Sequence, residues 1–239
     1  MISNQRLVEK MQAIILCGGL ATRLGETTKT LPKILLEIAG KTVLEWQTQL
    51  LTDAGVTTVI LASGHLHDTL YERVGDTYAG MRIRYAKEEK RLGTGGAVQN
   101  AMKQIETSPF FVLNGDILLA NFSLREMFLR FDQGMTGVLL SVHVPDIRPY
   151  GEIVSDGEGK IQAFREKQPT CRAGYINGGM YLFDQSIAEA FPSDQENFSM
   201  ERDVFPYVSK LYALKTDTDW IDIGVPERLT YARENFLHP

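Results

Sequence analysis

The 239-residue sequence is short of several features that define special classes of protein. It has only two cysteines, Cys17 and Cys171, and their wide separation excludes a disulfide framework or a cysteine-rich zinc site. No apolar run approaches the ~18 residues that a membrane span needs. The polar start MISNQRLVEK also lacks the apolar core of a secretory signal. We therefore expect a cytoplasmic protein that does not act at a membrane.

Basic charge is also scarce. The chain has 25 basic and 30 acidic residues, a net charge of −5, whereas nucleic-acid-binding proteins usually carry a basic patch. The four histidines show no metal-ligand or catalytic-triad spacing; they are His65, His67, His143 and His238. With 44% hydrophobic residues, a chain of this length can bury a core. The net negative charge still allows a local basic pocket for a small anionic ligand.

Hydrophobic patterning predicts an α/β fold in a single domain. Short apolar runs typical of buried strands (13–17, 57–61, 83–85, 110–113) alternate with helical spacing at 42–54, 66–74 and 96–105. This alternation predicts a mixed, mostly parallel sheet flanked by helices. After residue 137 strand-like runs dominate (137–144, 151–154, 160–164, 180–183), with helices expected at 185–191 and 226–236. No linker divides residues 11–239, and residues 1–10 are expected to form an N-terminal extension.

A glycine-rich loop follows the first predicted strand, where residues 17–33 read CGGLATRLGETTKTLPK. Gly18 and Gly19 would let backbone N–H groups approach phosphate oxygens closely. Arg23 supplies a planar fork suited to a terminal phosphate, and Lys33 supplies a compact point charge. The stretch therefore indicates a polyphosphate site.

The sequence matches neither of two common phosphate-binding loops, the GxxxxGK[ST] loop and the GxGxxG loop. A GxxxxGK[ST] loop ending at Gly40-Lys41-Thr42 would need glycine at position 35, where the chain has leucine. A GxGxxG dinucleotide loop is also absent, and the β-branched residues at 27–30 disfavour a helix opening there.

Instead, the motifs resemble those of the sugar-1-phosphate nucleotidyltransferase family over essentially all of residues 11–239. They are GGLATRL at 18–24, Pro32-Lys33, LGTGGA at 92–97, LNGD at 113–116, FREKQP at 164–169 and WIDIGVPE at 220–227. Two positions depart from the family pattern: Ala21 replaces a usual glycine and Thr42 a frequent proline. Alanine at position 21 must avoid a positive φ or bear strain.

The resemblance implies a Rossmann-like nucleotidyltransferase fold with a small β-rich sugar-binding part, and a Mg²⁺ ion held by Asp116 and Asp222. It assigns catalysis to Arg23, Lys33, Asp116, Lys167 and Asp222. The implied nucleotide-binding residues are Leu16, Gly18, Gly19, Thr22, Arg23, Lys33, Ser63, Gly64, Gly93, Thr94, Gly95 and Asp116. The implied sugar-phosphate-binding residues are Tyr150, Gly151, Glu166, Lys167, Asn177 and Gly178.

The implied reaction is attack of a sugar-1-phosphate oxygen on the α-phosphorus of a nucleoside triphosphate, with loss of pyrophosphate. Within the family the chain most resembles guanylyltransferases that act on D-glycero-α-D-manno-heptose 1-phosphate, through residues 11–19, 92–97, 148–151, 197–201 and 221–227. A mannose-1-phosphate guanylyltransferase, an N-acetylmuramate-1-phosphate uridylyltransferase and a non-catalytic sugar-nucleotide sensor remain alternatives. The expected partners are these small molecules, with no nucleic acid and no membrane, and a homodimer is left open.

Overall fold

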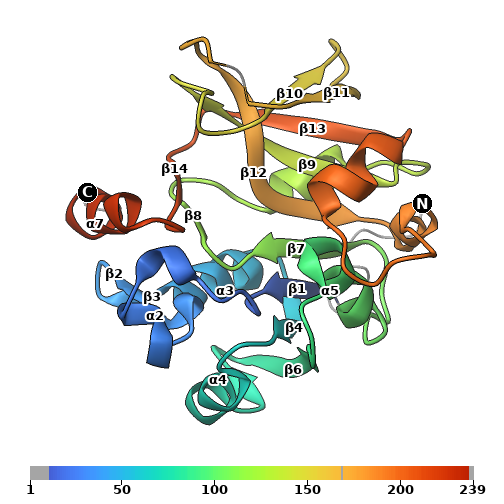
Figure 1. Cartoon of the computed structure of the whole chain (residues 1–239). Helices are drawn as coiled ribbons and strands as arrows, with labels where there is room; N and C mark the ends of the chain where they lie inside the picture. Colours follow the sequence, from blue (N-terminus) through green and yellow to red (C-terminus); the bar gives the residue numbers. More distant parts are fainter. Residues whose placement is uncertain (1–10, 168, 237–239) are drawn as a thin grey trace.

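A mixed β-sheet forms the centre of the protein (Figure 1). The computed structural model describes residues 11–167 and 169–236, so the expected extension at 1–10 lies outside the described residues. The strand order is β11-β10-β12-β7-β1-β4-β6-β5, with β9 beside β12 and β13 beside β9. The bounds are β1 Met11–Leu16, β4 Val56–Ser63, β5 Thr77–Tyr78, β6 Met81–Lys87, β7 Phe110–Asn114, β9 Gly137–Val144, β10 Glu152–Ser155, β11 Ile161–Arg165, β12 Gly174–Phe183 and β13 Leu211–Thr216.

The central strands β7, β1, β4 and β6 are parallel to one another, whereas β12 joins β7 and β5 joins β6 in the antiparallel sense. The carboxyl ends of β1, β4 and β7 therefore meet at one edge of the sheet. That edge is where open α/β sheets bind ligands. The expected mixed α/β fold is confirmed.

Both faces of the central sheet are buried, which explains the continuous apolar runs of its strands. Ile14 and Ile60 pack with α5 (Gly93–Met102) on one face. Their neighbours Ile15 and Leu61 pack with α3 (Val43–Asp53) on the other. Helix α3 begins as its sequence predicts, because Thr42 and Glu45 form a reciprocal capping box.

The long strand β12 connects the two halves of the molecule. Its end residues Met180–Phe183 pair with β7 and its first part pairs with β10, while β9 pairs with both ends of the strand on the other side. Figure 1 shows β12 running from the central sheet up to β9, β10, β11 and β13. These strands are the expected β-rich part.

Smaller elements complete the chain. They are the hairpin β2 (Glu37–Ile38) and β3 (Lys41–Thr42), the two-stranded sheet of β8 (Ile117–Leu119) and β14 (Trp220–Asp222), and the helices α2 (Thr27–Thr30), α4 (His67–Val74), α6 (Arg125–Arg130) and α7 (Pro226–Asn235). No helix among residues 11–167 and 169–236 is both long and apolar enough to cross a membrane.

Several local expectations were wrong. Residues 27–30 form the single helical turn α2, because the buried Thr28 hydroxyl donates to Ala21 O (3.0 Å) and tertiary contact overrides propensity. The helix expected at 185–191 is the 3₁₀ segment Gln185–Ala190, and α5 begins at Gly93 rather than Gly96. Sequence patterning also missed the short elements β8, β13, β14 and α6.

Candidate active site

The glycine-rich loop follows β1, and there is little room around its first glycine, Gly18. A Cβ atom on Gly18 would lie 2.6 Å from Glu88 Oε1 and 3.1 Å from the backbone nitrogen of Gly64. Ala21 adopts the left-handed conformation (φ 47°, ψ 33°), so it bears the strain that its sequence position implied. The next residues form the 3₁₀ turn Thr22–Leu24, which presents the exposed Arg23 to the pocket described below.

The turn that carries Asp116 is fixed by bonds from three directions. Gly115 N–H donates to Leu16 O (2.9 Å), and Ile223 N–H donates to Asp116 O (3.0 Å). The buried Gln47 of α3 donates through Nε2 to Asn114 O (2.8 Å) and Ile117 O (3.0 Å). Because these bonds use only backbone N–H and C=O groups of the turn, they do not engage the Asp116 carboxylate.

Asp222 reaches the same place from the other end of the chain. Strand β14 is antiparallel to β8, with Asp222 opposite Ile117, the residue after Asp116. The Asp222 Oδ1 atom accepts a hydrogen bond from Gly224 N–H (2.6 Å). Burial, and secondarily the negative charge of Asp116, raise the pKa of the Asp222 carboxyl. The two carboxylates thus form a pair that favours a bound cation.

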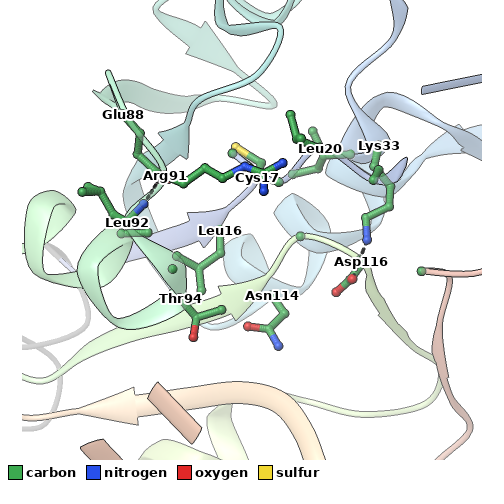
Figure 2. A pocket seen from close by; sticks show the side chains of 18 of the residues that line it. Leu16, Cys17, Leu20, Lys33, Glu88, Arg91, Leu92, Thr94, Asn114 and Asp116 are labelled. Atoms are coloured by element: carbon green, nitrogen blue, oxygen red, sulfur yellow. Dashed lines mark hydrogen bonds and ion pairs between the residues drawn. The ribbon is translucent and has the colours of Figure 1, made fainter. Parts of the chain in front are cut away.

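Lys33 is the basic residue that lies closest to this pair. Its Nζ lies 2.5 Å from Asp116 Oδ2, and both side chains remain partly exposed. Figure 2 shows this contact at one end of the pocket, opposite Glu88, Arg91 and Leu92. The expected phosphate-binding lysine therefore lies directly beside the carboxylate pair.

A cavity of about 630 Å³ lies over the carboxyl ends of β1 and β7. It collects most of the expected nucleotide-binding residues: Leu16, Gly18, Gly19, Thr22, Arg23, Lys33, Gly93, Thr94 and Asp116. Ser63 and Gly64 lie behind the glycine loop, where Ser63 bonds His67 Nδ1 (2.8 Å) and His65 N–H donates to Gly18 O (3.3 Å). This cavity is called the nucleotide pocket below.

A second cavity of about 370 Å³ lies between the central sheet and the β-rich part. Its lining includes five expected sugar-phosphate residues: Tyr150, Gly151, Glu166, Lys167 and Asn177. Gly178 lies behind it and accepts a hydrogen bond from Trp220 Nε1 (2.9 Å). This cavity is called the sugar pocket below. The two pockets share Asn114, Asp116 and Asp222, so ligands in both would meet at the carboxylate pair.

The glycines of the segment Leu92–Ala97 allow close packing against residues 196–198. A Cβ on Gly95 would come within 2.3 Å of the Phe198 ring, and one on Gly96 within 2.3 Å of Glu196 O. Gly95 N–H also donates to Phe198 O (2.8 Å). These glycines therefore allow the segment at 196–198 to pack on the start of α5, and Gly93 and Thr94 face the nucleotide pocket.

Sequence reasoning missed several residues that shape the site. Glu88 and Arg91 line the nucleotide pocket, and Figure 2 shows Arg91 extending from beside Leu92 toward Cys17. Arg228 contacts Asp222, while Gln47 holds the Asp116 turn. The charged run Glu88–Arg91 beside the LGTGGA motif was a usable signal for the first two. Nothing local in the sequence marks Gln47 or Arg228.

Asp116 and Asp222 are the candidate ligands for Mg²⁺ at this site. Among the residues that the structure describes, no group of three or more His, Cys, Asp or Glu side chains is placed to hold a metal ion. Mg²⁺ bound with a nucleotide needs only one or two carboxylates, because phosphate oxygens and water complete its octahedron. Asp116 and Asp222 at the junction of the pockets therefore fit the expected ion.

Comparison with known proteins identifies the family. The family model described as nucleotidyl transferase matches residues 12–238, so the chain belongs to this family. This confirms the family and the class of enzyme that the sequence motifs indicated, a sugar-1-phosphate nucleotidyltransferase.

Individual relatives are similar over most of the chain. D-glycero-alpha-D-manno-heptose 1-phosphate guanylyltransferase of Aneurinibacillus thermoaerophilus is 33% identical over 95% of this chain and 99% of its own. Mannose-1-phosphate guanyltransferase beta-B of Xenopus laevis is 34% identical over 91% of this chain, which spans 62% of that relative. The crystal structure of HddC from Yersinia pseudotuberculosis complexed with GMP-PN has a TM-score of 0.81 and 32% identity, covering 95% of this chain and 99% of that one.

Proposed function

We propose that the protein condenses GTP with D-glycero-α-D-manno-heptose 1-phosphate to give GDP-heptose and pyrophosphate. The observation that carries this proposal is the pair of adjoining pockets that share Asn114, Asp116 and Asp222. A transferase needs two anionic substrates to meet at one point. This arrangement brings them together at the carboxylate pair.

The residues support an in-line displacement without a general base. A phosphate oxygen of the sugar 1-phosphate forms the new bond to the α-phosphorus, and the bond from that phosphorus to the β-bridging oxygen breaks. The attacking oxygen is already ionised near neutral pH, so positioning and charge neutralisation dominate. Arg23 and the glycine-loop N–H groups hold the departing pyrophosphate, and Lys167 holds the attacking phosphate.

Asp116 and Asp222 are the residues that would hold Mg²⁺. When bound there, the ion lowers the repulsion between the two phosphates. Lys33 would then exchange its contact with Asp116 for the triphosphate, because a cation on Asp116 competes with the lysine for the same carboxylate.

Glu88 supports guanine as the base. Its carboxyl lies directly beside Gly18 in the nucleotide pocket and accepts a hydrogen bond from Leu92 N–H (3.3 Å). The N1–H and N2–H₂ groups of guanine are two adjacent donors that suit a carboxylate. Uracil offers a single N3–H donor between two carbonyl acceptors, and adenine places its N1 acceptor and a C2–H group there, so neither base presents two adjacent donors to the carboxylate. This observation favours guanylyl over uridylyl transfer.

The length over which this chain matches its relatives supports heptose 1-phosphate, rather than mannose 1-phosphate, as the substrate. The heptose 1-phosphate relative matches this chain along nearly its whole length, whereas the mannose 1-phosphate relative is considerably longer. A non-catalytic sensor on this fold is less favoured, because the chain retains Arg23, Lys33, Asp116, Lys167 and Asp222.

The test is pyrophosphate release with Mg²⁺ and heptose 1-phosphate, supplying GTP, UTP, CTP, dTTP or ATP in turn. Release with GTP alone is expected. Release with another nucleotide would discard the guanylyl assignment but keep the mechanism. If no nucleotide reacts, the panel is repeated with mannose 1-phosphate and N-acetylmuramate 1-phosphate. Release there would replace the heptose, and failure with every pair would leave the sensor.

A further inference from the structure

Arg228 of α7 joins the two pockets through a single guanidinium group. Its Nη2 lies 3.0 Å from Asp222 Oδ2, and its Nη1 donates to the Tyr150 hydroxyl (2.7 Å). Asp222 belongs to both pockets and Tyr150 to the sugar pocket, although 72 residues separate them in the sequence (222 minus 150). One side chain therefore fixes the distance between a metal-binding carboxylate and a sugar-binding hydroxyl.

The surroundings hold this bridge in place. Tyr150 lies between Arg228, whose guanidinium carbon is 5.6 Å from the ring centroid, and Trp220, whose ring meets it edge-on at 5.5 Å. Trp220 is anchored by its Nε1 bond to Gly178 O. Because side chains on a strand alternate in direction, Trp220 and Asp222 lie on the same side of β14 and both face the Tyr150 loop.

The two contacts at position 228 require the shape of an arginine side chain and not only its positive charge. The two acceptors are reached by different nitrogens of one planar fork, which a lysine ammonium cannot reproduce. Arg228 also keeps its Nε buried without a hydrogen-bond partner among the described residues. An unpaired buried donor costs about 1–3 kcal/mol, so a long apolar side chain would serve stability better at this position.

We propose that Arg228 is a positioning residue that couples the sugar pocket to the metal-binding carboxylate, by holding the Tyr150 hydroxyl and the Asp222 carboxylate in one fixed arrangement. A sugar phosphate seated against Tyr150 then meets Asp222 already oriented toward the nucleotide. Residues that orient a metal ligand typically change metal affinity or activity about 10- to 100-fold when replaced. The inference rests on the nucleotidyl transfer of the proposed function, but not on which sugar is transferred.

The test compares Arg228→Gln and Arg228→Lys with Arg233→Gln. Arg233 is a matched control on the same helix, because its side chain is exposed, its Nε donates to Glu37 O (3.2 Å), and it lines neither of the two pockets described above. The first readout is Mn²⁺ affinity, measured by electron paramagnetic resonance with a non-hydrolysable GTP analogue. Both Arg228 variants are expected to bind Mn²⁺ about 10- to 100-fold more weakly, and Arg233→Gln as the unmodified protein does.

The second readout is steady-state kinetics with the sugar 1-phosphate that the unmodified protein uses. We expect both Arg228 variants to lower kcat and raise KM for the sugar phosphate while KM for GTP changes less than about twofold. Tyr150→Phe combined with Arg228→Gln should be little worse than Arg228→Gln alone, because the hydroxyl acts through the arginine.

Unchanged Mn²⁺ affinity in folded Arg228 variants would overturn the proposal, as would a Lys variant that behaves like the unmodified protein. Thermal unfolding checks that each variant is folded. If no sugar phosphate reacts, the proposed function fails, but the Mn²⁺ measurement still decides the role of Arg228.

Discussion

The contact between Gly95 and Phe198 allows a test of how the start of α5 packs against residues 196–198. Substituting alanine for Gly95 places a Cβ atom 2.3 and 2.4 Å from two carbons of the Phe198 ring and 3.0 Å from its carbonyl oxygen. The ring cannot move aside freely, because Phe198 is completely buried. Its carbonyl also accepts the Gly95 N–H bond, which ties the two residues together.

The expected magnitude follows from two opposing terms. Overpacking a well-packed core costs about 1–3 kcal/mol. Replacing glycine by alanine inside a helix returns up to about 1 kcal/mol. Contacts of 2.3 and 2.4 Å belong to the severe end of the overpacking range, at about 2–3 kcal/mol, so the net loss in the free energy of unfolding should be about 1–2 kcal/mol. For a chain of this size that lowers Tm by about 2–8 °C.

The assay is thermal and urea unfolding of Gly95→Ala beside Gly157→Ala. Position 157 is the control, because its added Cβ meets no atom within 4 Å and its backbone φ is not positive. The control should change stability by less than about 0.5 kcal/mol. KM for GTP should rise in Gly95→Ala alone, since Thr94 beside it lines the nucleotide pocket.

A compensating change completes the argument. Phe198→Leu removes the ring edge that the new Cβ meets, so the double variant should lose at least about 1 kcal/mol less than the sum of the single losses. Strictly additive losses, or a Gly95→Ala variant as stable as the unmodified protein, would refute the packing explanation for this glycine.

Three further predictions concern charged residues of the site. Asp116→Asn should abolish turnover while Tm stays nearly unchanged. The ion pair of Asp116 with Lys33 is partly exposed, and such pairs contribute about 0–1 kcal/mol to stability. A fully active variant would show that Asp116 does not hold the metal ion. Lys167→Ala should raise KM for the sugar phosphate and leave KM for GTP unaltered, and unchanged sugar-phosphate kinetics would exclude Lys167 from phosphate binding. Glu88→Gln should relax the preference for GTP over UTP, measured as the ratio of kcat/KM. Burial raises the pKa of Glu88 above its ordinary 4.5, so the folded state binds more protons and this group lowers stability as pH rises through that range. The Gln variant should therefore lose less stability than the unmodified protein between pH 4 and 7 in urea unfolding, and equal losses would contradict a buried, proton-binding Glu88.

Short-range sequence signals predicted the central sheet well because both of its faces are buried. The runs around Ile14, Ile60 and Val112 are apolar at every position, and each is flanked by glycine or polar stops. The helical spacing at 42–54 likewise predicted α3, which spans Val43–Asp53. Such signals depend on neighbours in the sequence, so no tertiary information was needed to read them.

Elements that depend on distant partners were missed or misread. Strand β14 has three residues and exists because it pairs with β8, about 100 residues earlier. The turn α2 forms where β-branched residues disfavour a helix, since Thr28 donates to Ala21 O seven residues earlier in the same loop, a bond that no helical or strand periodicity indicates. Propensity is a weak guide wherever a long-range contact satisfies the backbone or the side chain.

The sequence alone determined the residue types of the site and the family to which the chain belongs, because the phosphate loop, Asp116, Lys167 and Asp222 stand in local motifs that can be read directly. The tertiary structure decided how these motifs work together. It placed Asp222 beside Asp116, directed Lys33 to that carboxylate, and brought Glu88, Gln47 and Arg228 into contact with the site. These relations join residues far apart in the chain. Only strand pairing and helix packing set them, so no local pattern carried them.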